Sequence, residues 1–380
     1  MSQRVIRNAR IVTATDTFLG CAVIEGDTFR AIDWGGATGS PGAEDWQGDW
    51  LLPGLVEVHT DNLEKHLVPR PGVIWNATSA TVTHDAQCAA AGITTVLDSI
   101  VIGDMDQGGT RSQTYQTSID ALHACRREGL MRVEHLLHLR CEVSAHDIVE
   151  NFERYADDEL VELASVMDHT PGQRQWRDLV KYRRYTERNG SLRDDEYTQL
   201  VRDRVAQQAA FAARHRAQVV AGCQSRGIPL ASHDDTELEH VELARREQVA
   251  ISEFPTTVHA AEAARAAGMA IVMGSPNLVK GGSHSGNVSA AELAQRGLLD
   301  ILSSDYVPAS LVQSAFLLRD QLGWEMPRAV ATVSRNPARA LSLQDRGEIA
   351  PGLRADFIRV KEAGGMPVVR GAWCRGERAF

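Results

Sequence analysis

Eight apolar runs that alternate with helical stretches constrain the fold of this chain more than any other feature. The runs have strand character and are Leu55–Asp61, Thr94–Ser99, Val133–Val143, Val161–His169, Pro229–Asp234, Val249–Phe254, Ala270–Gly274 and Asp300–Asp305. Most are followed by an Ala-rich or amphipathic stretch, and alternating strands and helices predict a parallel sheet. Eight such units predict an α/β fold, a (β/α)₈ TIM-like barrel. The segment Asp194–Arg226 is charged and alanine-rich, which predicts one long helix between the fourth and fifth strands.

The two ends of the chain have a different pattern, with short β-type runs separated by glycine-containing turns. Near the amino terminus the runs are Val5–Thr13 and Ala22–Ile32, and near the carboxyl terminus they lie within GEIAPGLRADFIRVKEAGGMPVVRGAWCRGERAF. Both ends carry apolar residues that need burial, so two unrelated flexible tails are the weaker interpretation. We therefore expect a small discontinuous β domain, residues 1–50 and 340–380, beside a barrel of residues 51–339.

The composition is that of an ordinary globular protein and argues against several classes. Of the 380 residues, 43% are hydrophobic and 24% charged, far from disordered or fibrous chains. We expect no membrane segment and no signal peptide, because the start MSQRVIRNARIV lacks an apolar core and a cleavage site. The six cysteines form no Cys-x-x-Cys pair, which favours a reducing cytoplasm. A formal net charge of −10 argues against nucleic acid as a partner but allows a local basic pocket for an anionic small molecule, and a homo-oligomer is left open.

Side chains of the kind that bind metals stand at the carboxyl ends of five predicted strands. They are His59, Asp61, Glu142, His169, His233 and Asp305. Alternate side chains of a strand share a face, so His59 and Asp61 point the same way and can hold one cation. Each histidine alone is more often structural, but barrel enzymes take their active-site residues from these strand ends, and the set is enough for two divalent metal ions. We expect His135, His138 and Glu253 to be structural.

Several motifs resemble those of the amidohydrolase superfamily over essentially the whole chain. They are the Pro-Gly-Leu strand with its metal motif, the segment GEIAPGLRADF and the aspartate that ends the last strand. The longer runs LPGLVEVHTDNLEKH, MDHTPGQRQ, GSPNLVKGGSHSGNVSA and ILSSDYVPASL resemble one subgroup of it, which acts in phosphonate catabolism. Asp61 stands where the superfamily usually has the second His of a His-x-His pair, and this more oxygen-rich site leaves Zn²⁺ or Mn²⁺ open. The superfamily's carboxylated lysine has no obvious counterpart, so Glu142 is our candidate for the bridging ligand.

The resemblance implies metal-dependent hydrolysis of a small-molecule sugar triphosphate, a ribose 5-triphosphate that carries a 1-methylphosphonate group. The products would be the 5-phosphate and diphosphate. A water whose pKa is lowered by two cations would attack the α-phosphorus, with Asp305 as its general base. Two alternatives are an amide- or lactone-hydrolysing amidohydrolase and a non-catalytic barrel scaffold. A scaffold has no need to bury paired charges at considerable cost, which argues against it.

A triphosphate needs cations and oriented N–H groups in its pocket. The candidate substrate-binding residues are Lys280, His284, Arg174, Lys181 and Arg184. Lys280 and His284 belong to a glycine-rich loop after the seventh strand, a frequent phosphate site in barrels, and glycines let backbone amides approach phosphate closely. For the run 181–184 a solvated helix face is as good an interpretation as a phosphate contact. These basic elements favour phosphate over an amide or lactone as the substrate group.

Overall fold

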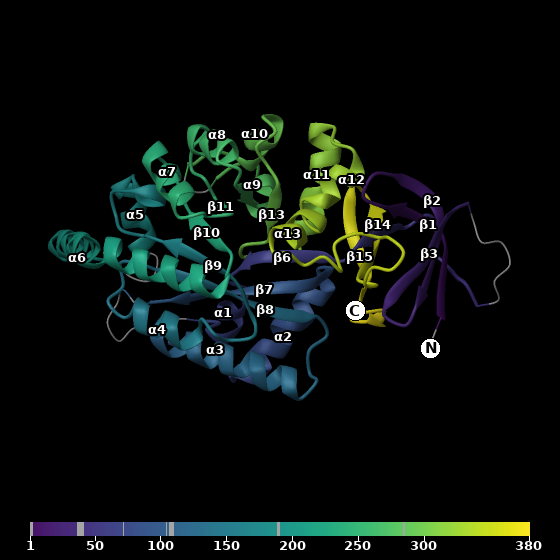
Figure 1. Ribbon diagram of the computed structural model, residues 1–380, viewed down its shortest axis with the longest axis horizontal. Helices are drawn as coiled ribbons and strands as arrows, with labels where there is room; N and C mark the ends of the chain where they lie inside the picture. Colours follow the sequence, from purple (N-terminus) through teal and green to yellow (C-terminus); the bar gives the residue numbers. More distant parts are fainter. Residues whose placement is uncertain are drawn as a thin grey trace.

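Two sheets organise the fold, a barrel of parallel strands and a mixed sheet at one end of the molecule (Figure 1). The computed structural model describes residues 3–35, 42–70, 72–103, 105, 110–187, 191–283 and 286–380. None of the helices in these ranges is both long and apolar enough to cross a membrane.

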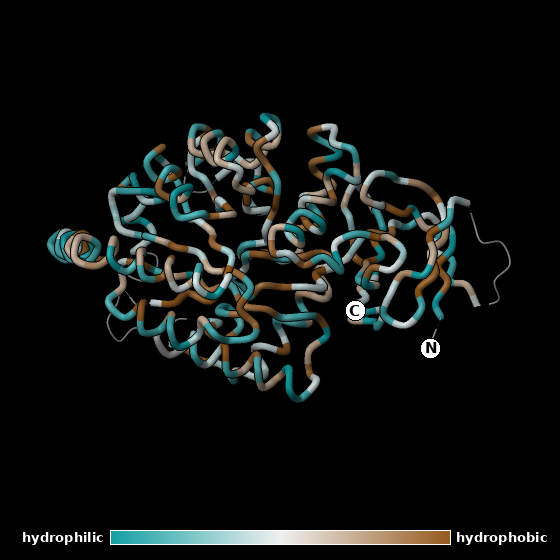
Figure 2. Tube along the Cα trace, viewed as in Figure 1, coloured by the Kyte–Doolittle hydropathy of each residue, from teal (hydrophilic) through white to brown (hydrophobic). Residues whose placement is uncertain are grey.

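The barrel has eight parallel strands, each hydrogen-bonded to the next in chain order. They are β6 (Leu55–Thr60), β7 (Ile93–Ile102), β8 (Glu134–Glu142), β9 (Val161–Met167), β10 (Leu230–His233), β11 (Ile251–Glu253), β12 (Ala270–Gly274) and β13 (Ile301–Ser303). Val58, Leu97 and Ile251 belong to the buried apolar cluster that these strands share. Figure 2 shows apolar strands in the middle and more polar helices around them. The predicted (β/α)₈ barrel is confirmed.

Helices follow most barrel strands and surround them. They are α1 (Asn62–Leu67), α2 (Ala77–Ala90), α3 (Thr110–Arg127), α4 (Ile148–Tyr155), η1 (Arg174–Trp176), α5 (Leu179–Thr186), α6 (Asp194–Arg226), α7 (Leu238–Arg246), α8 (Val258–Ala266), α9 (Ser275–Lys280), α10 (Ala290–Gln295), α11 (Ser310–Leu322), α12 (Met326–Ala331) and α13 (Arg335–Ala340). α6 has the bounds that the sequence predicted. It ends at Gly227, whose φ of 69° suits glycine because other residues are strained there.

The first and last barrel strands meet at a seam that few backbone bonds close. One isolated bridge joins Thr60 to Asp305, and the amide of Asp305 donates to the carbonyl oxygen of His59 at 3.1 Å. Next to this bridge, the amide of Ser304 donates to a carboxylate oxygen of the buried Glu57 at 2.6 Å. The barrel therefore closes beside two of the predicted metal ligands.

The mixed sheet combines strands from both ends of the chain. They are β1 (Gln3–Val12), β2 (Thr17–Glu25), β3 (Thr28–Trp34), β4 (Glu44–Asp45), β5 (Trp50–Pro53), β14 (Phe357–Ala363), β15 (Met366–Cys374) and β16 (Glu377–Arg378). Their order is β16-β15-β14-β5-β1-β2-β3, with β4 on β1. The prediction that both termini build one sheet is confirmed. The run expected at Ala22–Ile32 is split between β2 and β3, because the chain turns at Gly26, where φ is 62°.

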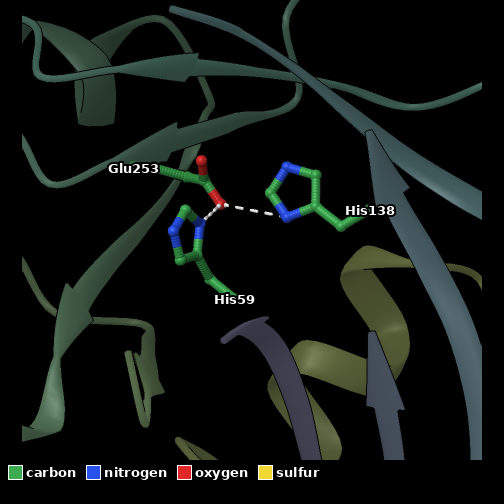
Figure 3. Close-up of side chains that lie close together, drawn as sticks. All are labelled: His59, His138 and Glu253. Atoms are coloured by element: carbon green, nitrogen blue, oxygen red, sulfur yellow. Dashed lines mark hydrogen bonds and ion pairs between the residues drawn. The ribbon is translucent and has the colours of Figure 1, made fainter. Parts of the chain in front are cut away.

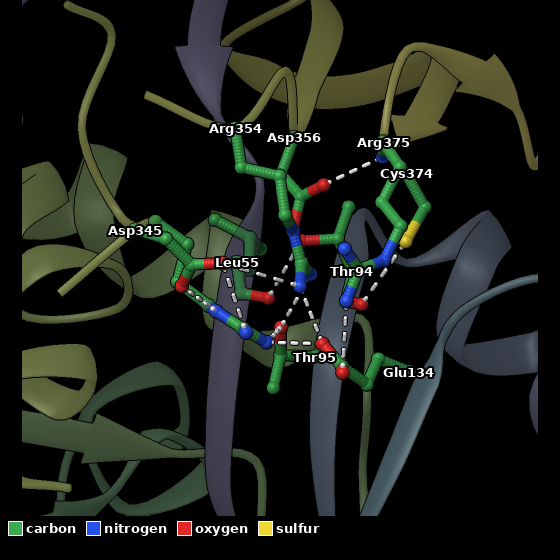
Figure 4. Close-up of polar contacts among 10 residues, drawn as sticks. Leu55, Thr94, Thr95, Glu134, Asp345, Arg354, Asp356, Cys374 and Arg375 are labelled. Carbon is green, nitrogen blue, oxygen red and sulfur yellow. Dashed lines mark hydrogen bonds and ion pairs between the residues drawn. The ribbon is translucent and has the colours of Figure 1, made fainter. Parts of the chain in front are cut away.

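An ion-pair network holds the carboxyl-terminal segment against the amino ends of the barrel strands (Figure 4). Its centre is Glu134, the first residue of β8, which pairs with Arg346, Arg354 and Arg375. Burial opposes the charged form of Glu134, but Arg354 and Arg346 outweigh burial and lower its pKa to about 2. Because strand β8 carries Glu142 at its other end, this network anchors the barrel at the end away from the predicted site.

Candidate active site

One cavity of about 940 Å³ opens at the carboxyl ends of the barrel strands and is lined by all six predicted metal ligands. They are His59, Asp61, Glu142, His169, His233 and Asp305. Five of them end a strand or follow it by one or two residues, which is where a barrel presents side chains to its active site. The pairing of β6 with β7 shifts in register between Glu57 and Thr60, the stretch that contains His59.

Glu253 fixes the orientation of two of these histidines. It is fully buried at the end of β11, and its two oxygens lie 3.0 Å from Nδ1 of His59 and 3.2 Å from Nδ1 of His233. An Nδ1–H that donates to a carboxylate leaves the Nε2 lone pair for a metal, the arrangement that orients metal-binding histidines in many enzymes. Burial, and then the charge of Arg140, lowers the pKa of His59, so its imidazole is neutral. We had expected Glu253 only to end its strand.

His138 packs edge-on against His59, with ring centroids 5.2 Å apart (Figure 3). Its Nδ1 lies 3.0 Å from the carbonyl oxygen of Val58. Burial lowers the pKa of His138 to about 3, so the ring is neutral. The figure shows Glu253 between the two imidazoles. His138 therefore lies where it can support the ring of His59.

A second group of ligand atoms lies across the cavity. Nδ1 of His169 is 2.7 Å from a carboxylate oxygen of Glu142, and Nε2 of His233 is 3.5 Å from a carboxylate oxygen of Asp234. His169, His233 and Asp234 offer ligand atoms that all lie within 4.8 Å of one another. Asp234 follows His233 directly and adds a carboxylate that our predicted ligand set did not include.

The electrostatics of this group fit divalent cations. Burial, and then the neighbouring Asp61 carboxylate, raises the pKa of Asp305 to about 7. Burial also raises the pKa of Asp234 to about 6, and Oδ1 of Asp61 is buried without a hydrogen-bond partner among the described residues. Carboxylates that repel one another beside neutral imidazoles are a donor set that a divalent cation satisfies.

The predicted substrate-binding residues occupy different places. Lys280, at the end of α9, lines the cavity. Arg174 is buried and donates from Nη1 to the carbonyl oxygen of His233 and to Asp235, both at 2.8 Å, so it supports the wall behind the histidines. Lys181 and Arg184 lie on α5, a helix that borders the cavity through other residues, including Tyr182 and Tyr185. His284 lies outside the described residues.

A separate buried cluster between α2 and strands β7 and β8 is held by its own hydrogen bonds. The carboxylate of Asp98 accepts bonds from Nε2 of His84 and Nδ1 of His135, both at 2.7 Å. Burial opposes a charged His135, but Asp98 and Asp85 together outweigh it and raise the pKa of His135 to about 9. The charges of this cluster are balanced by ion pairs within the protein. This agrees with the structural role that we expected for His135.

Solved structures of amidohydrolases share this architecture, and no family model matches the chain. N-isopropylammelide isopropylaminohydrolase from Burkholderia multivorans superposes with a TM-score of 0.65 at 17% identity, covering 100% of this chain and 98% of that one. N-acetyl-D-glucosamine-6-phosphate deacetylase from Mycobacterium smegmatis gives 0.64 at 16% identity, covering 99% and 100%. An amidohydrolase from a Sargasso sea sample also gives 0.64 at 16% identity, covering 100% and 93%. The chain thus has the fold of these enzymes, as the sequence motifs implied.

One curated relative matches along the whole length. α-D-Ribose 1-methylphosphonate 5-triphosphate diphosphatase from Escherichia coli is 45% identical over 378 residues, which are 99% of this chain and 100% of that protein. The chain therefore belongs to the family of these diphosphatases.

Proposed function

We propose that the chain hydrolyses α-D-ribose 1-methylphosphonate 5-triphosphate to α-D-ribose 1-methylphosphonate 5-phosphate and diphosphate. The observation that carries this proposal is full-length similarity to a relative of that name, together with a cavity that six metal-ligand side chains line. At about 940 Å³ the cavity is at the upper end of the usual range for small-molecule sites, as a ribose with four phosphorus groups requires. A reducing cytoplasm and a homo-oligomer stay predictions.

Two divalent metal ions, Zn²⁺ or Mn²⁺, form part of the proposal. The ligands would be the six predicted residues, with Glu142 as our candidate bridging ligand. When bound, such ions lower the pKa of water and neutralise charge on phosphoryl oxygens. The chain itself contributes orientation, because Glu253 holds the rings of His59 and His233 through their Nδ1 atoms.

Asp305 is our candidate general base. Its backbone is fixed at the barrel seam by the bond from its amide to the carbonyl of His59, so its carboxylate has a fixed place on the cavity wall. A carboxylate held there takes the proton of the attacking water as the bond to the α-phosphorus forms. The bond between the α-phosphorus and the bridging oxygen then breaks, and diphosphate leaves.

Phosphorus NMR of the products in ¹⁸O-labelled water tests the reaction. Attack at the α-phosphorus places the label in the sugar-linked phosphate and releases diphosphate in one step. Sequential trimming from the γ-end would instead release labelled orthophosphate, which contradicts the proposal. An enzyme that cleaves amides or lactones but leaves the triphosphate intact would favour the carbon-directed alternative.

A further inference from the structure

Arg140 brings a positive charge into the wall of the cavity among the predicted metal ligands. It lies on β8 two residues before Glu142, and alternate residues of a strand share a face. Leu136 on the same face belongs to the apolar cluster of the barrel strands, and His138 contacts His59. The guanidinium of Arg140 therefore reaches the cavity from the barrel interior, whereas Lys280 reaches it from the end of a helix.

One donor atom of Arg140 has no acceptor in the described part of the chain. Its Nε is buried and has no hydrogen-bond partner among the residues that the structure describes. Two other cations of the cavity region are already held: Arg174 donates to a carbonyl and a carboxylate, and Lys65 donates to the carbonyl oxygen of Tyr306. A buried donor without a partner costs free energy unless a ligand accepts its bond.

Arg140 lines the same cavity as His59, which lies on β6, and Asp305, which follows β13. The guanidinium thus shares the cavity with metal-ligand candidates that come from two different barrel strands.

A permanent cation at this position calls for an anion. Arginine does not lose its proton in proteins, so beside divalent metals it is repelled unless negative charge lies between them. A phosphoryl group supplies that charge, and its oxygens match the planar fork of N–H donors on a guanidinium. Neutral amides or lactones offer neither the charge nor several oxygens in that geometry.

We propose that Arg140 binds the non-bridging oxygens of the phosphoryl group that is attacked. This inference rests on the proposed function and deepens it. Arg140 would favour substrates that place an anionic group beside the metal ligands. Charge on those oxygens changes as the pentacoordinate transition state forms. Arg140 would then lower the barrier to turnover as well as bind the substrate.

The test uses orthophosphate as a probe with the full-length, metal-loaded protein, so that it does not depend on the identity of the sugar. Calorimetric titration should show binding to the wild type and an affinity about 10- to 100-fold lower for Arg140→Met, the effect of losing a charge-assisted pair. Arg140→Lys keeps the charge without the fork and should fall between them. Arg246→Ala removes an exposed arginine on α7 and should bind phosphate like the wild type.

Turnover of the triphosphate gives a second readout that a structural role would not move. Arg140→Ala should lose more in kcat than in KM, and added guanidinium chloride at non-denaturing concentration should restore part of kcat. Metal content, measured by elemental analysis, should equal that of the wild type. Phosphate affinity unchanged in folded, metal-loaded Arg140→Met and Arg140→Lys variants would overturn the proposal.

The two proposals fail in different ways. If the wild type leaves the triphosphate intact but binds phosphate through Arg140, the proposed substrate is wrong and the anion site stands. If the wild type hydrolyses the triphosphate and the Arg140 variants bind phosphate as tightly as the wild type, the role proposed for Arg140 is wrong and the function stands.

Discussion

The backbone amide of Ser304 donates a hydrogen bond of 2.6 Å to the carboxylate of Glu57, across the seam between the last and first barrel strands. The other oxygen of the same carboxylate accepts the amide of His59 at 2.7 Å. One buried side chain thus adds to the few backbone bonds that close the seam. It also fixes the chain next to His59 and Asp305, which would bind metal from opposite sides of the seam.

Replacing Glu57 by Gln should destabilise the protein and loosen this corner of the site. The amide would turn an NH₂ group toward one of the two backbone N–H donors, and a buried donor left without an acceptor costs about 1 to 3 kcal/mol. Chemical denaturation measures the loss. Glu150→Gln, an exposed glutamate on α4, is the matched control and should be neutral. Equal stability of both variants would show that the seam does not depend on the carboxylate.

Glu253→Gln should weaken metal binding without unfolding the chain. A glutamine has one acceptor oxygen where Glu253 offers two, so His59 or His233 loses its Nδ1 partner, and such losses typically reduce metal affinity about 10- to 100-fold. Dialysis against a graded series of chelator concentrations, followed by elemental analysis, measures this. His59→Ala, which removes a ligand, should lose more metal than Glu253→Gln. The exposed Glu239→Gln on α7 should behave like the wild type.

Asp305→Asn keeps the shape of the side chain and removes the base. Turnover should fall by about 10² to 10⁴, the range typical of general-base removal, while substrate binding is largely preserved. Metal content must be measured on the same preparation, because the carboxylate is also a predicted ligand. A turnover number close to that of the wild type would move the proton to another group, with His233 and Asp234 the next to replace.

Lys280→Ala should raise KM by about tenfold and leave kcat and metal content unchanged. A point charge at the mouth of the cavity contributes binding in the ground state and the transition state alike. Steady-state kinetics checks this against Lys361→Ala, an exposed lysine on β14. Kinetic constants that match the control would shift the phosphate contacts toward Lys181 or Arg184.

The network at the opposite end of the barrel makes a prediction about pH. Because the folded pKa of Glu134 is lowered to about 2, its ion pairs stabilise the protein above the ordinary glutamate pKa of 4.5 and are lost as pH falls toward 2. Glu134→Gln should therefore be less stable than the wild type at pH 7, by on the order of 2 kcal/mol. The difference in melting temperature between the two should shrink as pH falls from 5 to 3. The exposed Glu128→Gln should show no such convergence.

The sequence was sufficient to predict the scaffold and the residues around the cavity. Apolar runs of strand length alternating with helices leave few topologies, and parallel strands that close into a barrel carry their carboxyl ends to one rim. His59, His169 and Asp305 could therefore be placed together without knowing any distance between them. The helix Asp194–Arg226 was also predictable, because its acidic start and its glycine stop are local signals.

Contacts between side chains on distant strands could not be predicted in the same way. Glu253 holds His59 and His233 only because the barrel brings three separate strands together, and no local pattern marks that contact. That Arg140 faces the site could have been predicted, since strand alternation puts it on the same face of β8 as Glu142. That its Nε has no partner among the described residues depends on packing around the whole cavity.

The shared sheet of the two termini also affects how the chain can fold as it is synthesised. Strand β5 pairs with β14, so Pro53 has its partner Phe357 only when nearly the entire chain has been made. At ribosomal rates the edge of β5 waits on the order of tens of seconds for that partner. An unpaired strand edge invites pairing with other chains, so we expect the nascent protein to be prone to such pairing until β14 has been made. A chain truncated before residue 357 would expose the same edge permanently.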